Sequence, residues 1–449
     1  MASVIVTPPS GISVEFRGGG RSQIAPDGSL LIEASPLHDA LIVESYTPAW
    51  DGSRNGAVLN PGGAMPAAGY GLDARMGGLR RTAVPVAMMP GDALVIARSA
   101  PPSAPQVDWP TPLASATSRS VVEAMQLVMA VPYDPTAADL FRPTAIGRSQ
   151  LACALRATHC SRRSVRVDNL PRLVRLDALP PIALAPHRDA LAAFQGELFS
   201  GWSTDIATPG LQHLGYGSWL AACVSEIAVL LCSTLRTADK LDLAHLVVQA
   251  GIDLIGAFAD DRQQSANGGH CGGRKALVML AGILTGTPAA TPDRFLGAGS
   301  PFVERWRYKM APWWFNGTPA GAPWHAAWAF ADAAAFSSSR SNGSMVALPP
   351  SQWGDPEDPQ HQTWAWCVKH YMGQVVGADV GTGLAMRLLG RGADWSAAGT
   401  AFLEQWFQGP GPGVRAALEQ AGIVVPWGTS YGVTAPPDWC AAAWRQVVG

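Results

Sequence analysis

The chain has 449 residues, of which 48% are hydrophobic and 15% charged, and its formal net charge at pH 7 is -2. This composition excludes a disordered protein, because it provides enough apolar surface to offset the entropy lost on folding. The near-neutral charge, without any Lys/Arg block, argues against a nucleic-acid-binding protein. The length predicts two or three domains.

The seven cysteines form no Cys-x-x-Cys pair, so we expect buried free thiols and neither a disulfide framework nor a zinc site. No metal or cofactor is expected. The N-terminal stretch "MASVIVTPPSGISVEF" lacks the features of a secretory signal. The most apolar runs are shorter than the roughly 20 residues of a membrane span, so we expect no membrane insertion.

Residues 1–115 are predicted to form a β-rich docking module, built as a β-sandwich. Short alternating segments are separated by Gly/Pro/Asp turns, as in "SVEF", "SLLIEA", "DALIVESY" and "ALVIARS". Residues 101–117 hold five prolines and are typical of a linker. Residues 116–189 predict a β-rich connector, because β-branched, alternating text continues there with Leu-Pro breaks.

Residues 190–449 are predicted to form a helical domain. Apolar residues recur three and four apart in "GSWLAACVSEIAVLLCSTL", "TADKLDLAHLVVQAGIDLIGAFA" and "GGRKALVMLAGILTG". We expect helices near 218–236, 239–258 and 273–286 to be antiparallel neighbours, with Thr237 capping the second. Helical text continues to about residue 408.

The stretch "NGGHCGGRK" joins the second of these helices to the third. Its glycines permit a tight turn, and the free amides of the next helix, together with Arg274 and Lys275, favour an anion beside His270. A glycine-rich helix start with a satisfied histidine and two solvated basic side chains is the more frequent situation for such a stretch.

The text "SGWSTDIATPGLQHLGYGSWLAACVSEIAVLL", followed by "NGGHCGGRKALVMLAGILTG", resembles a family of bacterial and prophage proteins. Their C-terminal half is an α/α-toroid of the polysaccharide lyase and glycoside hydrolase type. The resemblance covers about residues 194–407 and implies a toroid here. It departs from the family where Ser218 and Trp219 replace a charged pair after Tyr216 and Gly217.

A lyase needs a group that neutralises a uronate carboxylate and a base that removes the α-carbon proton. His270, Tyr216 and Arg274 are the candidate catalytic residues, with His213 and Lys275 as candidate ligand contacts. The base could equally be His325 or His370. A glycosidase needs two facing carboxylates, but the sequence singles out no pair among Asp205, Asp260, Asp261, Asp355, Glu357 and Asp358.

Of the 17 tryptophans, 15 lie from Trp202 onward, and flat aromatic faces are suited to stacking on sugars. Trp313 and Trp314 lie side by side in a Pro/Gly-bounded loop, which makes them candidate ligand-binding residues along with His325. At helical spacing, as for Trp324 and Trp328, core packing is the favoured interpretation.

Two functional hypotheses follow. In the first, the chain is a structural protein of a phage or phage-like virion, made in the host cytoplasm without a signal peptide. Its β module would contact other virion proteins, its toroid would bind host-surface polysaccharide, and the chain would form a homo-oligomer. In the second, it is a polysaccharide-degrading enzyme, either a lyase or a glycoside hydrolase.

Overall fold

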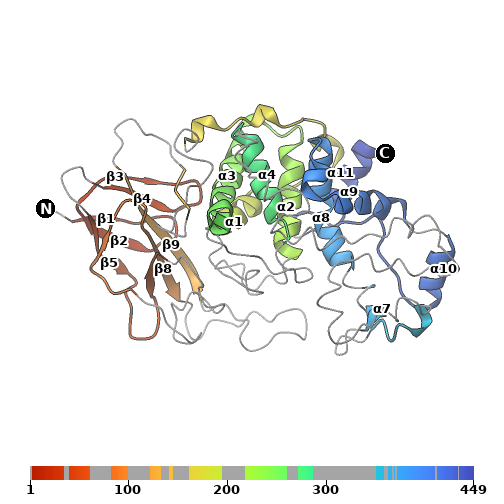
Figure 1. Ribbon diagram of the computed structural model, residues 1–449, viewed down its shortest axis with the longest axis horizontal. Coiled ribbons are helices and arrows are strands. Elements are labelled where there is room, and N and C mark those ends of the chain that lie inside the picture. The colour runs from red at the N-terminus through yellow and green to blue at the C-terminus, as the bar shows by residue number, and fades with distance from the viewer. Residues whose placement is uncertain are drawn as a thin grey trace.

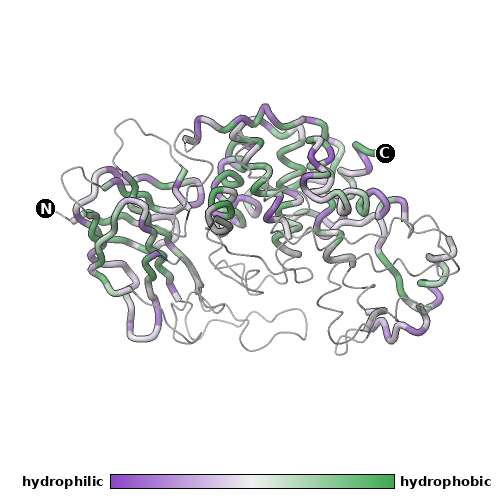
Figure 2. The backbone as a smooth tube through the Cα atoms, viewed as in Figure 1, coloured by the Kyte–Doolittle hydropathy of each residue, from purple (hydrophilic) through white to green (hydrophobic). Residues whose placement is uncertain are grey.

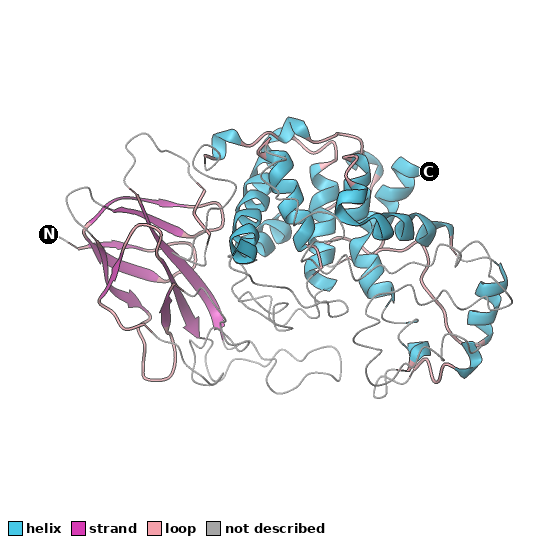
Figure 3. Cartoon of the chain, in the orientation of Figure 1, coloured by secondary structure: helices cyan, strands magenta, loops and turns pink. Residues whose placement is uncertain are grey.

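The computed structural model combines β-sheets and helices, and the two kinds of structure are segregated along the chain (Figures 1 and 3). The strands gather at one end of the long axis, next to the N-terminus, and the helices occupy the rest (Figure 1). The residues that the structure describes are 3–34, 40–60, 82–99, 122–132, 141–144, 161–194, 218–259, 272–286, 350–357, 363–366, 369, 372–409, 412–432 and 434–449.

Nine strands are described, and the alternating segments of the sequence supply the main ones. The strands are β1 (Val4–Val6), β2 (Ser13–Arg17), β3 (Gly19–Ile24), β4 (Leu30–Ala34), β5 (Leu41–Thr47), β6 (Ala57–Leu59), β7 (Val86–Met88), β8 (Ala93–Ser99) and β9 (Val122–Val131). They form two sheets, which we call the first and the second. The first has the order β1-β2-β5-β7 and the second β3-β4-β9-β8-β6.

The two sheets share one apolar cluster. Side chains from the first sheet, such as Phe16 and Val43, pack with Ile32 and Val128 from the second. The chain passes from the first sheet to the second at Gly18, whose φ is +79° and where a Cβ would lie 2.8 Å from the carbonyl oxygen of Ala40. A residue with a side chain would therefore be strained and crowded at this crossing.

The second sheet is also buried on its other face. Leu31, Val95, Leu127 and Met129 lie outside the shared cluster, and each is at most 1% exposed. A sheet covered on both faces contributes more buried apolar area per strand than one with a solvated face.

Strand β9 lies in the segment that we expected to be a connector, but it is a central strand of the second sheet. It pairs in parallel with β4 and antiparallel with β8. We also expected strands in the residues beyond β9, but the described residues there form three short 3₁₀ turns, at 162–164, 167–169 and 176–178. The Leu-Pro breaks in that stretch oppose a continuous strand, since proline lacks the amide that a ladder needs.

The helices of the C-terminal part begin close to their expected positions. They are α1 (Ala185–Phe194), α2 (Ser218–Leu231), α3 (Thr237–Ala259), α4 (Arg274–Leu284), α7 (Trp364–Trp366), α8 (Met372–Leu388), α9 (Gly392–Gln408), α10 (Pro412–Gln420) and α11 (Trp439–Val448). Apolar residues dominate α2, α3 and α4, which appear mainly green in Figure 2. These helices form one large apolar cluster with α8, α9 and α11.

The most extensive contact of α2 is with α8, some 150 residues further along the chain, rather than with its neighbour α3. Gly381 makes this close approach possible, because a Cβ there would lie 2.5 Å from the carbonyl oxygen of Ser225 and 2.7 Å from the sulfur of Cys440. Gly251 plays the same part between α3 and α4, where a Cβ would lie 2.4 Å from that of Ala281. The helix packing therefore depends on glycine at both crossings.

Candidate functional site

Two of the residues predicted to bind or transform a ligand lie in the described part of the chain. Arg274 and Lys275 form the first turn of α4, and each is 1% exposed. The ammonium of Lys275 donates a hydrogen bond of 2.5 Å to the backbone oxygen of Trp395. Their burial favours a structural role at the start of α4, and their contact with an acidic glycan stays a prediction.

The last glycine of the motif also serves helix packing. Gly273 caps α4 with φ +86°, and a Cβ there would lie 3.0 Å from the Cα of Ala221 on α2. The turn is thus held close to α2.

The other predicted site residues lie outside the described residues, and they are His213, Tyr216, His270, Trp313, Trp314 and His325.

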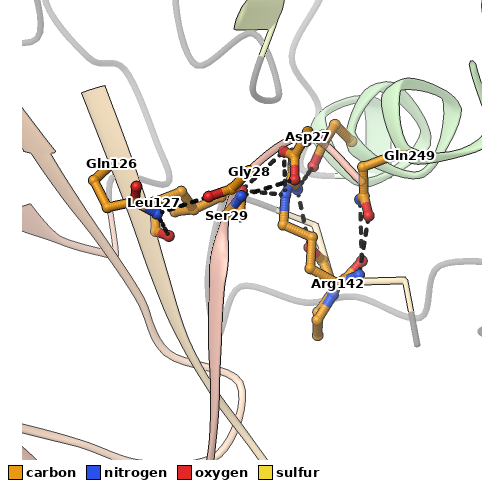
Figure 4. A network of polar contacts seen from close by, with 9 residues as sticks. Asp27, Gly28, Ser29, Gln126, Leu127, Arg142 and Gln249 are labelled. Carbon is orange, nitrogen blue, oxygen red and sulfur yellow. Dashed lines mark hydrogen bonds and ion pairs between the residues drawn. The ribbon is translucent and has the colours of Figure 1, made fainter. Parts of the chain in front are cut away.

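A buried polar network that the sequence did not reveal joins the two halves of the molecule at Arg142 (Figure 4). The guanidinium Nε donates to Asp27 Oδ2 at 2.8 Å, in the turn before β4, and to the Ser29 hydroxyl at 3.0 Å. Its Nη1 and Nη2 donate to the two carboxylate oxygens of Asp253 on α3, with an Nη2–Oδ2 distance of 2.5 Å. Arg142, Asp27 and Asp253 are 1%, 3% and 2% exposed.

The backbone of Arg142 is fixed as firmly as its side chain. Its amide donates to the Gln249 side chain at 2.9 Å, and its carbonyl oxygen accepts from the same side chain at 3.1 Å. Gln249 and Asp253 are four residues apart on α3, so they lie on one helix face. The preceding residue, Phe141, packs in the helical cluster with its ring 5.9 Å from that of His245.

One cation faces two carboxylates in this network. Burial lowers the pKa of Arg142, but the carboxylates of Asp253 and Asp27 together raise it by a larger amount. The pKa of Arg142 therefore lies above its ordinary value. The guanidinium keeps its proton and offers donors in a planar fork, which suits two carboxylates at once. We call this set, formed by Asp27, Ser29, Arg142, Gln249 and Asp253, the Arg142 network.

A second buried cluster joins α1, α2 and the C-terminal segment. His187 Nδ1 lies 2.8 Å from the carbonyl oxygen of Ala183, which can only accept, so Nδ1 carries a proton. His187 Nε2 lies 2.7 Å from Glu226 Oε2 and 2.7 Å from the Thr434 hydroxyl, which also donates to Glu226.

Histidine and glutamate are the residue types of general acid–base catalysis. His187 is 0% and Glu226 1% exposed, however, and Thr434 is the half-buried member of the cluster. Burial and the charge of Glu226 also raise the pKa of Cys223 and Cys440, so these thiols stay protonated and unreactive. The hydrogen bonds of His187, Glu226 and Thr434 instead join α1, α2 and the C-terminal segment.

Some of these residues carry a sequence signal and others carry none. Glu226, Gln249 and Asp253 are polar residues within otherwise apolar helical text, and a polar residue on an apolar helix face signals a buried partner. Arg142, in "LFRPT", has no such context, and its partners are 115 and 111 residues away.

Comparison of the chain with protein-family models, with curated proteins and with solved structures finds no match. Within the described ranges, no group of three or more His, Cys, Asp or Glu side chains is arranged to hold a metal ion. No helix in the same ranges is both long and apolar enough to cross a membrane.

We predict that Arg142→Met destabilises the protein strongly, because it leaves Asp27 and Asp253 buried without their cation. The expected loss is about 3–5 kcal/mol, as for other broken buried ion pairs, measured by urea unfolding. Replacing all three charges, with Asp27→Asn and Asp253→Asn added, should recover most of it.

Arg175→Met is the matched control, because the Arg175–Asp177 ion pair is 68% exposed on both sides. Its loss of stability should be small, because both members of the pair are open to solvent and screened by salt. If Arg142→Met were as mild as this control, the Arg142 network would not stabilise the fold.

Proposed function

We propose that this chain is a structural component of a phage or phage-like particle. In this proposal the N-terminal part is a β-sandwich module that docks onto other virion proteins, and the helical part is an α/α-toroid-like domain that binds host-surface polysaccharide. The chain acts there as a homo-oligomer within the assembly.

The observation that carries the proposal is the edge of the first sheet. Strand β1 is the end strand of that sheet, and in the described part of the chain it pairs with β2 alone. Val4 and Ile5 on this strand are 48% and 66% exposed. An edge strand with exposed apolar side chains supports pairing with a strand of another chain, which is a common mode of protein assembly.

The Arg142 network supports a fixed orientation of the helical part relative to the β module. A receptor-binding domain is useful on a particle only if it is held at a defined angle to its anchor. Asp27 belongs to the β module and Asp253 to α3, so the ion pairs with Arg142 hold the two parts together without a flexible hinge at this contact.

The burial of Arg274 argues against a direct part for this residue in catalysis. At 1% exposure its guanidinium is placed to support the helix start rather than to meet a substrate. The enzyme hypothesis, a polysaccharide lyase or glycoside hydrolase, remains the alternative and depends on His270 and Tyr216. The resemblance of "NGGHCGGRK" to the toroid proteins supports a glycan ligand in either case.

We predict that Ile5→Lys removes the chain from particles, because a charge on the outer edge of β1 opposes pairing with another strand. Particles purified from producing cells would be probed with an antibody against the chain. Leu173→Lys is the control, since Leu173 is 55% exposed but lies outside the sheets. Equal incorporation of both variants, or particles lacking the wild-type chain, would refute docking through β1.

A second prediction separates binding from catalysis. On beads carrying purified acidic capsular polysaccharide, the wild-type chain should be retained and the polysaccharide should keep its length. The double change Trp313→Ala and Trp314→Ala should weaken retention by about tenfold or more, given the usual weight of aromatic contacts. Shortening of the polysaccharide that disappears in His270→Ala would instead establish the enzyme. No retention at all would contradict both hypotheses.

A further inference from the structure

The first turn of α3 follows the C-terminal end of α2 after a short turn. The segment 161–179 crosses this end of the helical part and supplies donors to the last carbonyl groups of α2 and α4. The amides of Leu173 and Val174 donate to the carbonyl oxygen of Cys232, at 3.1 and 3.2 Å. The amide of Arg166 donates to the carbonyl oxygen of Leu284 at 2.7 Å. These bonds satisfy one carbonyl group at the C-terminal end of each of α2 and α4.

Lys240 places an unpaired cation at this junction. Its side chain is 2% exposed, and its Nζ has no hydrogen-bond partner within the described part of the chain. Lys240 belongs to the first turn of α3, and helical side chains lean toward the N-terminus of their helix, so the ammonium lies beside that terminus. A buried charge without a partner is costly, which makes it a marker of a missing ligand.

The groups around Lys240 carry both signs of charge. Burial and the charge of Arg172 lower the pKa of Lys240 to about 8, while Cys232 and Asp168 oppose this shift. Lysine with this pKa still carries its proton at pH 7. The start of α3 adds the positive end of a helix of 23 residues.

Arg172 is the solvent-exposed cation near Lys240. Its side chain is exposed, and its Nη2 makes two long hydrogen bonds of 3.4 Å, to the carbonyl oxygens of Thr234 and Leu235. Such weak bonds permit the guanidinium to turn toward a ligand at little cost. The nearby carboxylate of Asp239 is engaged by Arg236 at 2.7 Å, which leaves the exposed Asp168 as the acidic group on the rim.

We propose that the N-terminus of α3 is a binding site for an oxyanion, held by the Lys240 ammonium, the Arg172 guanidinium and the first-turn amides. Sulfate, phosphate and carboxylate groups share the required chemistry. The site lies at the opposite end of α3 from the glycine-rich turn that precedes Arg274, so it is separate from the proposed glycan contact and does not rest on it.

The test is calorimetric titration of the whole protein with sodium sulfate at constant ionic strength, repeated with phosphate and with acetate. Lys240→Met should lower sulfate affinity by about tenfold or more, the usual weight of a charge-assisted hydrogen bond. Arg172→Met, a change at the surface that should leave the fold intact, should lower it by about threefold or more. Arg236→Met is the matched control, because this cation lies at the same helix end, is 83% exposed and faces Asp239.

The pH dependence provides a second readout. Sulfate does not titrate between pH 7 and 10, so its affinity should fall as the pH rises through the pKa of Lys240, about 8 in the free protein. In Lys240→Met this fall should be absent. Stronger binding of phosphate than of acetate would identify a tetrahedral anion, and the reverse a carboxylate. The proposal is overturned if wild-type protein binds none of the three saturably, or if Lys240→Met and Arg236→Met bind sulfate equally.

Discussion

The molecule depends on one buried arginine. Arg142 places its guanidinium between Asp27 of the β-rich part and Asp253 of the helical part, and each of the three residues is at most 3% exposed. An arginine side chain does not lose its proton in a protein, so this charge cannot be relieved by neutralisation. Separating the two parts would break the ion pairs of Arg142 with one or both carboxylates. We therefore expect the two parts to unfold together.

This constraint bears on how the chain could work. The Arg142 network joins the β-rich part, whose edge strand is β1, to the helical part, and a fixed connection of this kind would suit the proposed role of presenting a surface from an anchor. The cluster of His187, Glu226 and Thr434 and the close α2–α8 contact at Gly381 stiffen the helical part further. The polar groups of the Arg142 network and of the His187 cluster thus connect separate segments of the fold.

The sequence predicts local structure well where a single face decides it. The alternation in "DALIVESY" gives β5, and the apolar runs give α2, α3 and α4 within a few residues. Non-local pairing escapes such reasoning. The parallel pairing of β9 with β4 joins strands about 100 residues apart, and nothing in the text of either strand specifies the other. The Arg142 network escapes it for the same reason.

At the candidate site, too, local structure could be predicted from the sequence, whereas long-range contacts could not. The sequence located the start of α4 at Arg274, because a glycine turn before an apolar helix has a local cause. It did not predict that Arg274 and Lys275 would be buried, since burial is decided by α2 and by the backbone at Trp395, more than 100 residues away from Lys275. Lys240 could have been noticed as a cation near an apolar helix face, but that its Nζ has no hydrogen-bond partner among the described residues is visible only in three dimensions.

Scanning calorimetry of the wild-type protein tests the central claim most directly. If the Arg142 network makes one cooperative unit of the β-rich and helical parts, the protein unfolds in a single transition whose calorimetric and van't Hoff enthalpies agree. Two separate transitions, or a calorimetric enthalpy well above the van't Hoff value, would show that the halves unfold independently and would contradict the account.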